Sequence, residues 1–239
     1  MSVFKSALIT FSKALFPNRC ELCGEVIALD RKVCKSCENP PVIQPPLCEY
    51  CGSSETECSC KKHKHEYKQI VAPYYYRDSL VYAIHRYKNS EMLFLADRLS
   101  EDIYKCVKAY YGDISFDMIT YVPLRKLRQR KRGFNQSELL ARKISEKLGA
   151  PALPLLVKIR YTGVQHHKSA MERKADVFGS YDVSDKYKNR LDGKMILLID
   201  DVKTTGSTLN ECAKMLKIYG AKSVYCAVAA ITNNKRQQP

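Results

Sequence analysis

The chain has 239 residues, 45% of them hydrophobic, and a formal net charge of +15. This is the composition of a soluble globular protein with one sizeable core and room for a small appendage, and it excludes a chain embedded in a membrane. Residues 1–66 hold nine Lys/Arg against eight Asp/Glu, whereas residues 67–239 hold 31 against 17. The positive surface therefore belongs to the second part, where it predicts an anionic partner, either nucleic acid or a phosphorylated small molecule.

The first apolar positions of the chain recur at helical spacing, at Phe4, Leu8, Phe11 and Leu15. Lysines interrupt this stretch, and no small-residue cleavage site follows it. We therefore expect a docking helix rather than a signal peptide or a membrane anchor, and a cytoplasmic protein.

Eight of the eleven cysteines lie between positions 20 and 60, mostly in pairs separated by two residues. Repeated pairs of this kind predict zinc ribbons with two sites, each holding one Zn²⁺ through four thiolates. Gly24 and Gly52 follow two of the pairs, where a positive φ lets backbone amides turn toward the thiolates. The expected ligands are Cys20, Cys23, Cys34 and Cys37 for the first site, and Cys48, Cys51, Cys58 and Cys60 for the second.

The second zinc site is the irregular one, because Cys58 and Cys60 are separated by a single residue. An alternative pairs Cys60 with His63 and leaves Cys58 spare. A disulfide framework is the alternative for all eight cysteines, although no secretion signal places the chain in an oxidising compartment. The three remaining cysteines lie in apolar patterns and are expected in the core.

After residue 66 the chain alternates between strand and helix patterns. The expected strands are QIVAPYYY (69–76), DMITYVP (117–123), ILLI (196–199) and KSVYCAVAAI (222–231). Helical spacing of apolar residues joins Met92 to Tyr110 and Leu140 to Leu148. The alternation predicts an α/β domain over 67–239, a mainly parallel sheet with helices on both faces, next to a small zinc-ribbon domain over 1–66. Ligands of such sheets bind beyond the carboxyl ends of the strands.

The most informative stretch is ILLIDDVKTTGST, residues 196–208. A buried strand is expected to end at Asp200, and a helix to begin near Ser207. The turn between them offers N–H groups and hydroxyls at the positive end of a helix, which suits a phosphate monoester. The two adjacent carboxylates suit sugar hydroxyls and a magnesium ion. The stretch therefore predicts a site for a sugar 5-phosphate, with a simple capped helix after an acidic strand end as the alternative.

Residues 125–132, RKLRQRKR, contain six basic residues among eight. One or two of them could serve a small ligand, but six exceed that need. With Phe134 and Tyr121 nearby for base stacking, the run predicts a groove for single-stranded DNA, and the solvated start of a helix is the alternative. The residues expected to contact nucleic acid are Arg125, Lys126, Arg128, Arg130, Lys131 and Arg132.

ILLIDDVKTTGST resembles the phosphoribosyl-pyrophosphate (PRPP) motif of type I phosphoribosyltransferases. Together with VPLRKLRQRKRGFNQSELLA, KIRYTGVQHHKSAMERKADVFGSY and the cysteine pairs, it resembles the ComF family of bacterial competence-type proteins over nearly the whole chain. The block RGFNQ, residues 132–136, is highly specific in combination with the others. Two departures are the C-x-C pair and Asp176, where family members commonly carry Asn.

The resemblance implies that Asp200 and Asp201 are catalytic and meet the ribose hydroxyls and Mg²⁺. It implies that PRPP is held by Pro123, Leu124 and Arg125 at the pyrophosphate, and by Lys203, Thr204, Thr205, Gly206, Ser207 and Thr208 around the 5-phosphate. Segment 158–173 resembles the loop that closes over PRPP and excludes water, and an ordinary surface loop is the alternative. Its residues expected to face the site are Arg160 and Gln165, taken as catalytic, with Thr162 and Arg173.

Three classes of function remain open. An orphan phosphoribosyltransferase would transfer the phosphoribosyl group of PRPP to a nitrogen nucleophile. A PRPP-responsive protein of DNA uptake and natural transformation would bind single-stranded DNA through the basic segment and use the PRPP site as a sensor or as part of a reaction. A zinc-dependent interaction protein would bind a competence helicase or another competence factor and would need neither PRPP nor DNA. No pocket for an acceptor is recognisable, since the zinc ribbon stands where many such enzymes place their acceptor-binding hood, so the sequence supports PRPP binding better than turnover.

Overall fold

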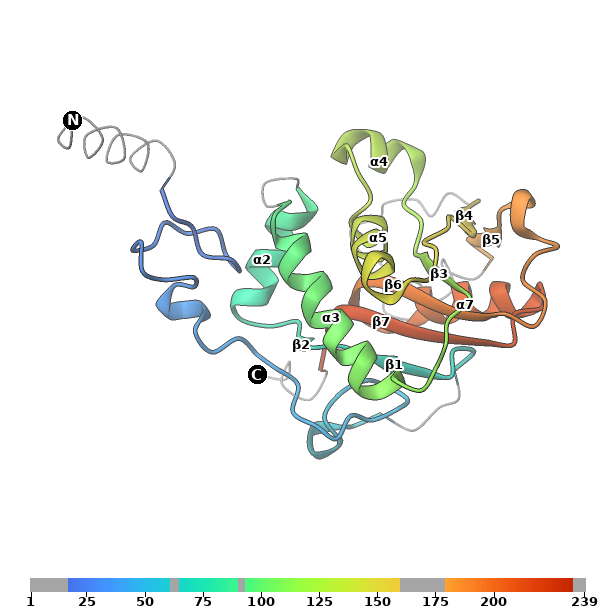
Figure 1. Ribbon diagram of the computed structural model, residues 1–239, viewed down its shortest axis with the longest axis horizontal. Coiled ribbons are helices and arrows are strands. Elements are labelled where there is room, and N and C mark those ends of the chain that lie inside the picture. Colours follow the sequence, from blue (N-terminus) through green and yellow to red (C-terminus); the bar gives the residue numbers. More distant parts are fainter. Residues whose placement is uncertain (1–16, 61–64, 90–92, 160–178, 234–239) are drawn as a thin grey trace, which may run out of the picture.

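The computed structural model describes residues 17–60, 65–89, 93–159 and 179–233 (Figure 1). The helix expected over residues 4–15 and the loop residues 160–173 lie outside these ranges. Among the described helices, none has the length and apolar character needed to cross a membrane.

The expected parallel sheet is confirmed. Its strands are β1 (Gln69–Val71), β2 (Tyr74–Tyr75), β3 (Met118–Tyr121), β6 (Met195–Lys203) and β7 (Ser223–Ile231). The order is β1-β7-β6-β3, and β2 also pairs with β7 beyond β1. The single strand expected over residues 69–76 is thus two short ones, because Pro73 between them lacks an N–H for the ladder and its carbonyl accepts from the amide of Ile43 at 2.9 Å.

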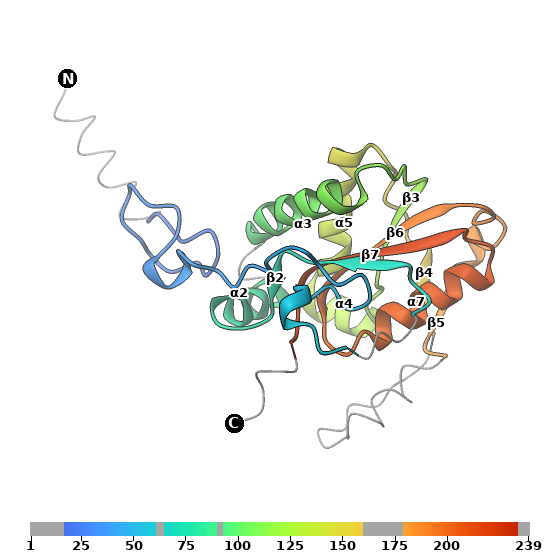
Figure 2. The same ribbon diagram turned by 90° about the horizontal axis from the view of Figure 1, so that it is seen from below.

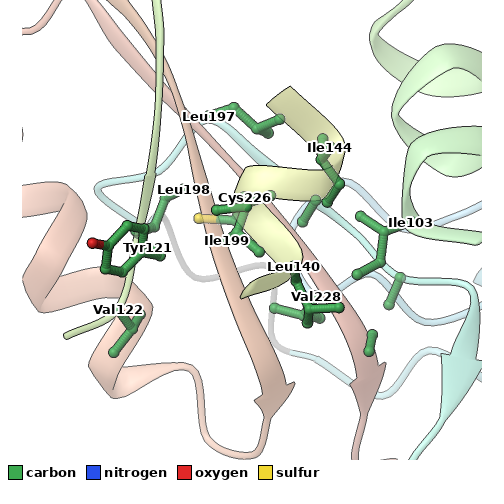
Figure 3. Packing of buried hydrophobic residues seen from close by; sticks show 14 of the residues in the cluster. Ile103, Tyr121, Val122, Leu140, Ile144, Leu197, Leu198, Ile199, Cys226 and Val228 are labelled. Carbon is green, nitrogen blue, oxygen red and sulfur yellow. The ribbon is translucent and has the colours of Figure 1, made fainter. Parts of the chain in front are cut away.

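Helices cover both faces of this sheet, as the strand composition requires. Helices α3 (Leu95–Tyr111) and α5 (Gln136–Leu148) pack on one face and α7 (Ser207–Ile218) on the other, while α2 (Ser79–Lys88) packs against α3 (Figure 2). Figure 3 shows Ile103 of α3 and Leu140 and Ile144 of α5 gathered over β6 and β7. Since both central strands are covered on both sides, their apolar residues are almost fully buried.

The remaining elements are short. Strands β4 (Leu156–Lys158) and β5 (Tyr181–Val183) form an antiparallel pair, and α4 (Lys126–Arg132) stands between β3 and α5. Three 3-10 turns complete the described elements, η1 (Lys35–Cys37), η2 (Glu55–Glu57) and η3 (Asp185–Tyr187). Helix α4 ends at Gly133, whose φ of 81° is the left-handed conformation that glycine adopts without strain.

The eight cysteines form the two groups of four that the spacing predicts. Within each group all Sγ atoms lie within 4.8 Å of one another, for example 3.7 Å between Cys48 and Cys60 and 3.5 Å between Cys51 and Cys58. A Zn–S bond of about 2.3 Å places the thiolates of a tetrahedral site about 3.8 Å apart, so both groups fit a structural Zn²⁺. Cys58 therefore belongs to the second group, and His63 lies outside the described residues.

The two cysteine groups attach to different parts of the larger domain (Figure 1). The first contacts the helices, because Arg86 of α2 donates to the carbonyl of Cys23 at 2.9 Å and Arg98 of α3 lies 3.5 Å from Glu21. The second lies against the sheet, where the amide of Ser54 donates to the hydroxyl of Tyr75 at 3.0 Å. A domain boundary at residues 66 and 67 stays a prediction.

Candidate ligand site

A cavity of about 260 Å³ opens beyond the carboxyl ends of β3 and β6, where the parallel topology places a ligand site. Five chain segments that are distant in sequence contribute to its wall. It is lined by Lys88, Val122, Pro123, Leu124, Arg125, Arg128, Arg132, Ser137, Lys158, Tyr181, Asp200, Asp201 and Thr208. The structure thus brings the two predicted acids together with the predicted turn after β3.

The two acids at the end of β6 have different partners. Asp200 Oδ1 accepts from the Ser137 hydroxyl and from the amide of Asp201, both at 2.8 Å, while Asp201 Oδ1 lies 2.9 Å from the ammonium of Lys88. Burial raises the pKa of Asp200 to about 7, and the negative charge of Asp201 adds to the effect. The pair therefore holds more negative charge than the protein around it compensates.

The strand that carries these acids is longer than expected. The sequence predicts an end at Asp200, but β6 continues to pair with β7 as far as Lys203, which lies opposite Ile231. The apolar run stops at Ile199 because the next two residues, Asp200 and Asp201, line a polar cavity, so loss of hydrophobicity does not mark the end of the strand here.

Several cationic side chains also line the cavity. Arg125, Arg128, Arg132 and Lys158 line it, and the Lys158 ammonium donates to the Tyr181 hydroxyl at 3.1 Å. Burial and the charge of Arg128 lower the pKa of Lys158, and the same two causes lower that of Arg132. A bound anion relieves the mutual repulsion among these cations, so this part of the cavity suits phosphate or pyrophosphate.

The RGFNQ block fixes the turn after β3. The Asn135 amide group donates to the carbonyl of Val122 at 3.1 Å, and its oxygen caps α5 by accepting from the amide of Ser137 at 3.0 Å. The amide of Val122 itself donates to Ile199 of β6 at 3.0 Å. One side chain therefore links the turn, the start of α5 and, through Ser137, the acid pair.

The same block fastens the end of α2 to the site. Gln136 Nε2 donates to the carbonyl of Lys88 at 3.0 Å, and the Tyr87 hydroxyl donates to the carbonyl of Gln136 at 3.0 Å. These bonds hold Lys88 where its ammonium meets Asp201. The motif thus positions a cation that lies 48 residues before Gln136 in the chain.

The predicted phosphate turn leads from β6 into α7. Gly206 has a φ of 82°, and the hydroxyls of Thr205 and Ser207 lie 2.9 Å apart at the start of the helix. Of this turn, Thr208 lines the cavity. Lys203 is directed elsewhere, because its ammonium donates to the carbonyl of Cys51 in the second cysteine group at 3.1 Å.

Two further expectations meet the structure at α4. Tyr121 is only 7% exposed, so the prediction that it stacks on bases is wrong, because it is a core residue of β3. Arg128 and Arg130 are exposed on α4, while the side chains of Lys126 and Lys131 lie outside the described part of the structure. Arg160 and Gln165, with the rest of segment 160–178, also lie outside it.

Sequence reasoning missed four polar residues that line the cavity: Lys88, Ser137, Lys158 and Tyr181. A signal existed for the helix that carries Lys88, since its buried residues recur at helical spacing, at Leu80, Ala83, Ile84 and Tyr87. The other three reach the site through tertiary packing and through the pairing of β4 with β5. Local sequence patterns do not predict either arrangement.

Comparison with known proteins agrees with both halves of the chain. The model of the phosphoribosyl transferase domain matches residues 134–239, and that of the double zinc ribbon domain matches residues 11–67. Competence protein F of Haemophilus influenzae is 29% identical over 219 residues, covering 87% of this chain and 95% of that one. DNA utilization protein YhgH of Escherichia coli K12 is 30% identical over 218 residues, covering 87% and 94%.

A relative from a Gram-positive bacterium and a solved structure extend the comparison. Competence protein ComFC of Bacillus subtilis is 28% identical over 198 residues, or 78% of each chain. The crystal structure of a purine phosphoribosyltransferase from Pyrococcus horikoshii superposes with a TM-score of 0.37 at 22% identity, covering 57% of this chain and 73% of that one.

Proposed function

The chain belongs to the ComF family, in which a double zinc ribbon precedes a phosphoribosyltransferase domain, and from this premise we propose that it binds PRPP with Mg²⁺ in the cavity beyond β3 and β6. We further propose that this binding serves the uptake or processing of DNA, as the names of its relatives suggest.

One observation carries the proposal: an acid pair and a group of cationic side chains line a single cavity. PRPP carries groups that suit both sets of side chains. Its ribose hydroxyls can donate to carboxylates, and its 5-phosphate and pyrophosphate are anions that suit cations. Asp200 and Asp201 accept from the hydroxyls, and Arg125, Arg128 and Lys158 receive the pyrophosphate. The start of α7, with Thr208, receives the 5-phosphate.

The residues at the acid pair also suit magnesium. Mg²⁺ prefers carboxylate oxygens and keeps several waters, which two adjacent aspartates at a polar cavity permit. The hydrogen bonds and the ion pair described above engage Oδ1 of each carboxylate, and we propose Oδ2 of each as the ligand atom for the cation. When bound, the ion supplies charge neutralisation for the departing pyrophosphate.

The same arrangement supports transferase chemistry without a protein nucleophile. As pyrophosphate leaves the anomeric carbon, positive charge develops on the ribose, and the fixed carboxylates stabilise it while the arginines neutralise the leaving group. Arg160 and Gln165 are proposed to complete the site from the loop. The identity of the acceptor is left open by this proposal, and PRPP binding without turnover is its alternative form.

Calorimetric titration with PRPP, with and without Mg²⁺, tests the assignment. Changing Asp200 and Asp201 together to Asn keeps their shape and removes their charge, so affinity should drop at least about tenfold, or roughly 1.4 kcal/mol. Asp185→Asn is the matched control, because that carboxylate is exposed and lies outside the cavity. Wild-type affinity in the double variant would sink the assignment.

A second candidate function is binding of single-stranded DNA, alone or with a competence helicase. The observation that favours it is the exposure of Arg128 and Arg130 on α4 beside an apolar groove of about 680 Å³ in which Phe134 and Leu139 take part. Stacking on an aromatic ring next to basic side chains is how proteins hold single strands without sequence preference. Fluorescence anisotropy with a labelled oligonucleotide tests it, and Arg128→Ala, Arg130→Ala and Lys131→Ala together should weaken binding.

We propose a cytoplasmic location on chemical grounds. Eight cysteines arranged for thiolate ligation of zinc remain ligands in a reducing compartment.

A further inference from the structure

Lys203 is a buried cation that the proposed ligand does not explain. It is the last residue of β6, only 8% exposed, and its ammonium donates to the carbonyl of Cys51 at 3.1 Å. A buried ammonium is costly unless it is paired and hydrogen-bonded. Its partner here is the backbone of the second cysteine group, whose thiolates with Zn²⁺ carry net negative charge.

The backbone of the second cysteine group is joined to the larger domain at three successive carbonyls. Glu49 accepts from the amide of Ile70 at 3.3 Å, Tyr50 from the Tyr67 hydroxyl at 3.3 Å, and Cys51 from Lys203. All three belong to the loop between Cys48 and Cys51, whose shape four thiolates and a metal fix.

The phosphate turn rests on two of these three donors. A Cβ built on Gly206 would lie 3.1 Å from Cε of Lys203 and 3.5 Å from the Tyr67 hydroxyl, so the backbone of the turn sits directly on both side chains. The Lys203 stem therefore packs against Gly206, which immediately precedes the first residue of α7.

We propose that the second cysteine group supports the phosphate turn from behind, and that Lys203 is the positioning residue that couples the two. The inference rests on the proposed function, because it assigns the 5-phosphate to that turn. Zinc at the second group fixes the Cys51 carbonyl, the carbonyl fixes Lys203, and Lys203 fixes Gly206. Among the described residues, the first cysteine group contacts α2 and α3 instead, through Arg86 and Arg98, which do not touch Gly206.

Selective loss of each zinc site tests the coupling. Cys58→Ser with Cys60→Ser removes the second site, and Cys34→Ser with Cys37→Ser is the matched control that removes the first; metal analysis should find one zinc in each. With ribose 5-phosphate as the probe in calorimetry, the first pair should weaken binding roughly tenfold and the control by less than about twofold. Equal losses from both groups would overturn the inference, whereas failure of the wild type to bind PRPP would count against the proposed function.

Variants of Lys203 test the link itself. Lys203→Met keeps the stem and removes the ammonium, so both zinc ions should stay while affinity for ribose 5-phosphate falls roughly fivefold or more, and Lys203→Arg should restore part of it. Coupling is reciprocal, so PRPP should slow the release of one of the two zinc ions to a chromogenic chelator in the wild type and have no such effect in Lys203→Met. The release measurement can be made on the wild type alone. If bound PRPP does not slow the release of either zinc ion, the coupling is contradicted.

Discussion

Asp200 and Asp201 are neighbours in sequence with different polar partners. The charge of Asp201 is matched by Lys88 at 2.9 Å, whereas the donors to Asp200 among the described residues are a hydroxyl and an amide, both at 2.8 Å. Neutral donors compensate a buried carboxylate less than an ammonium does. In the unliganded site, ionisation of Asp200 is therefore less favourable than ionisation of Asp201.

This imbalance predicts a pH effect on stability in the absence of added Mg²⁺. The pKa of Asp200 is raised from 3.8 to about 7 in the folded chain, so its protonation favours folding at low pH and that contribution is lost as the pH rises through about 7. The free energy of unfolding of the wild type should fall between pH 5.5 and pH 8 by on the order of 1 to 3 kcal/mol more than that of Asp200→Asn. Urea unfolding at the two pH values measures this, with exposed Asp113→Asn as control, and parallel curves for wild type and Asp200→Asn would refute it.

Asn135 allows its two roles to be separated. Asn135→Ala loses both the helix cap and the tether to Val122, and should cost about 1 to 2 kcal/mol of stability. Asn135→Asp keeps the capping oxygen and loses the donor to Val122, so it should retain much of the stability and still weaken PRPP binding. Thermal unfolding and calorimetry on both variants distinguish these outcomes. An Asp variant with wild-type affinity would show that the tether does not position the turn.

At the residue scale, the sequence was informative where chemistry is local. The acid pair and the cysteine groups were predicted because their members lie within a few tens of residues and their types carry the chemistry. Lys88, Lys158 and Tyr181 were not, because each is an ordinary residue until the fold brings it to the cavity. Lys203 was assigned to PRPP from its place in the motif, whereas its side chain points to Cys51.

At the scale of elements, periodicity found the long helices and the buried strands and misplaced two boundaries. The first strand is divided at Pro73, and β6 runs on to Lys203 through residues too polar to read as a strand. Strands β4 and β5, of three residues each, are too short for a pattern to identify. The predicted boundaries were wrong in two places: where Pro73 lacks a backbone donor, and where β6 enters the ligand site.

Metal removal should affect more than the ribbons. Purified protein should contain two zinc ions per chain by mass spectrometry of metals. Because the backbone of the second group accepts from Ile70 and Lys203, chelation should lower the thermal midpoint of the whole chain, rather than unfold the N-terminal part alone. Near-ultraviolet circular dichroism of the tyrosines in the larger domain measures the thermal midpoint of that domain. Protein that folds normally without zinc would rule out the ribbon assignment.

At the scale of the whole molecule, the basic run predicted from the sequence forms α4. Arg128 and Arg132 of this helix line the cavity, and Arg128 and Arg130 are exposed to solvent. A small anionic ligand and a nucleic-acid backbone would therefore share α4, so the two candidate functions make use of neighbouring surfaces.

A salt titration separates the two uses of α4. If about four phosphates are neutralised, affinity for single-stranded DNA should fall with salt at a log-log slope near −3. The triple change Arg128→Ala, Arg130→Ala and Lys131→Ala should flatten the slope, whereas Asp200→Asn should leave it unchanged. Wild-type slope and affinity in the triple variant would place DNA binding elsewhere or exclude it.

The attachment of the second ribbon also bears on aggregation. Strands β1 and β2 form an outer edge of the sheet, and the stretch from Pro41 to Ser54 supplies its missing hydrogen bonds, as Pro41 does for Tyr75 at 2.8 Å and Glu49 for Ile70 at 3.3 Å. An unpaired apolar edge is a template for pairing with another chain. A truncated chain that begins at Tyr67 would expose this edge, so it should form soluble oligomers or precipitate at concentrations where the full-length chain stays monodisperse.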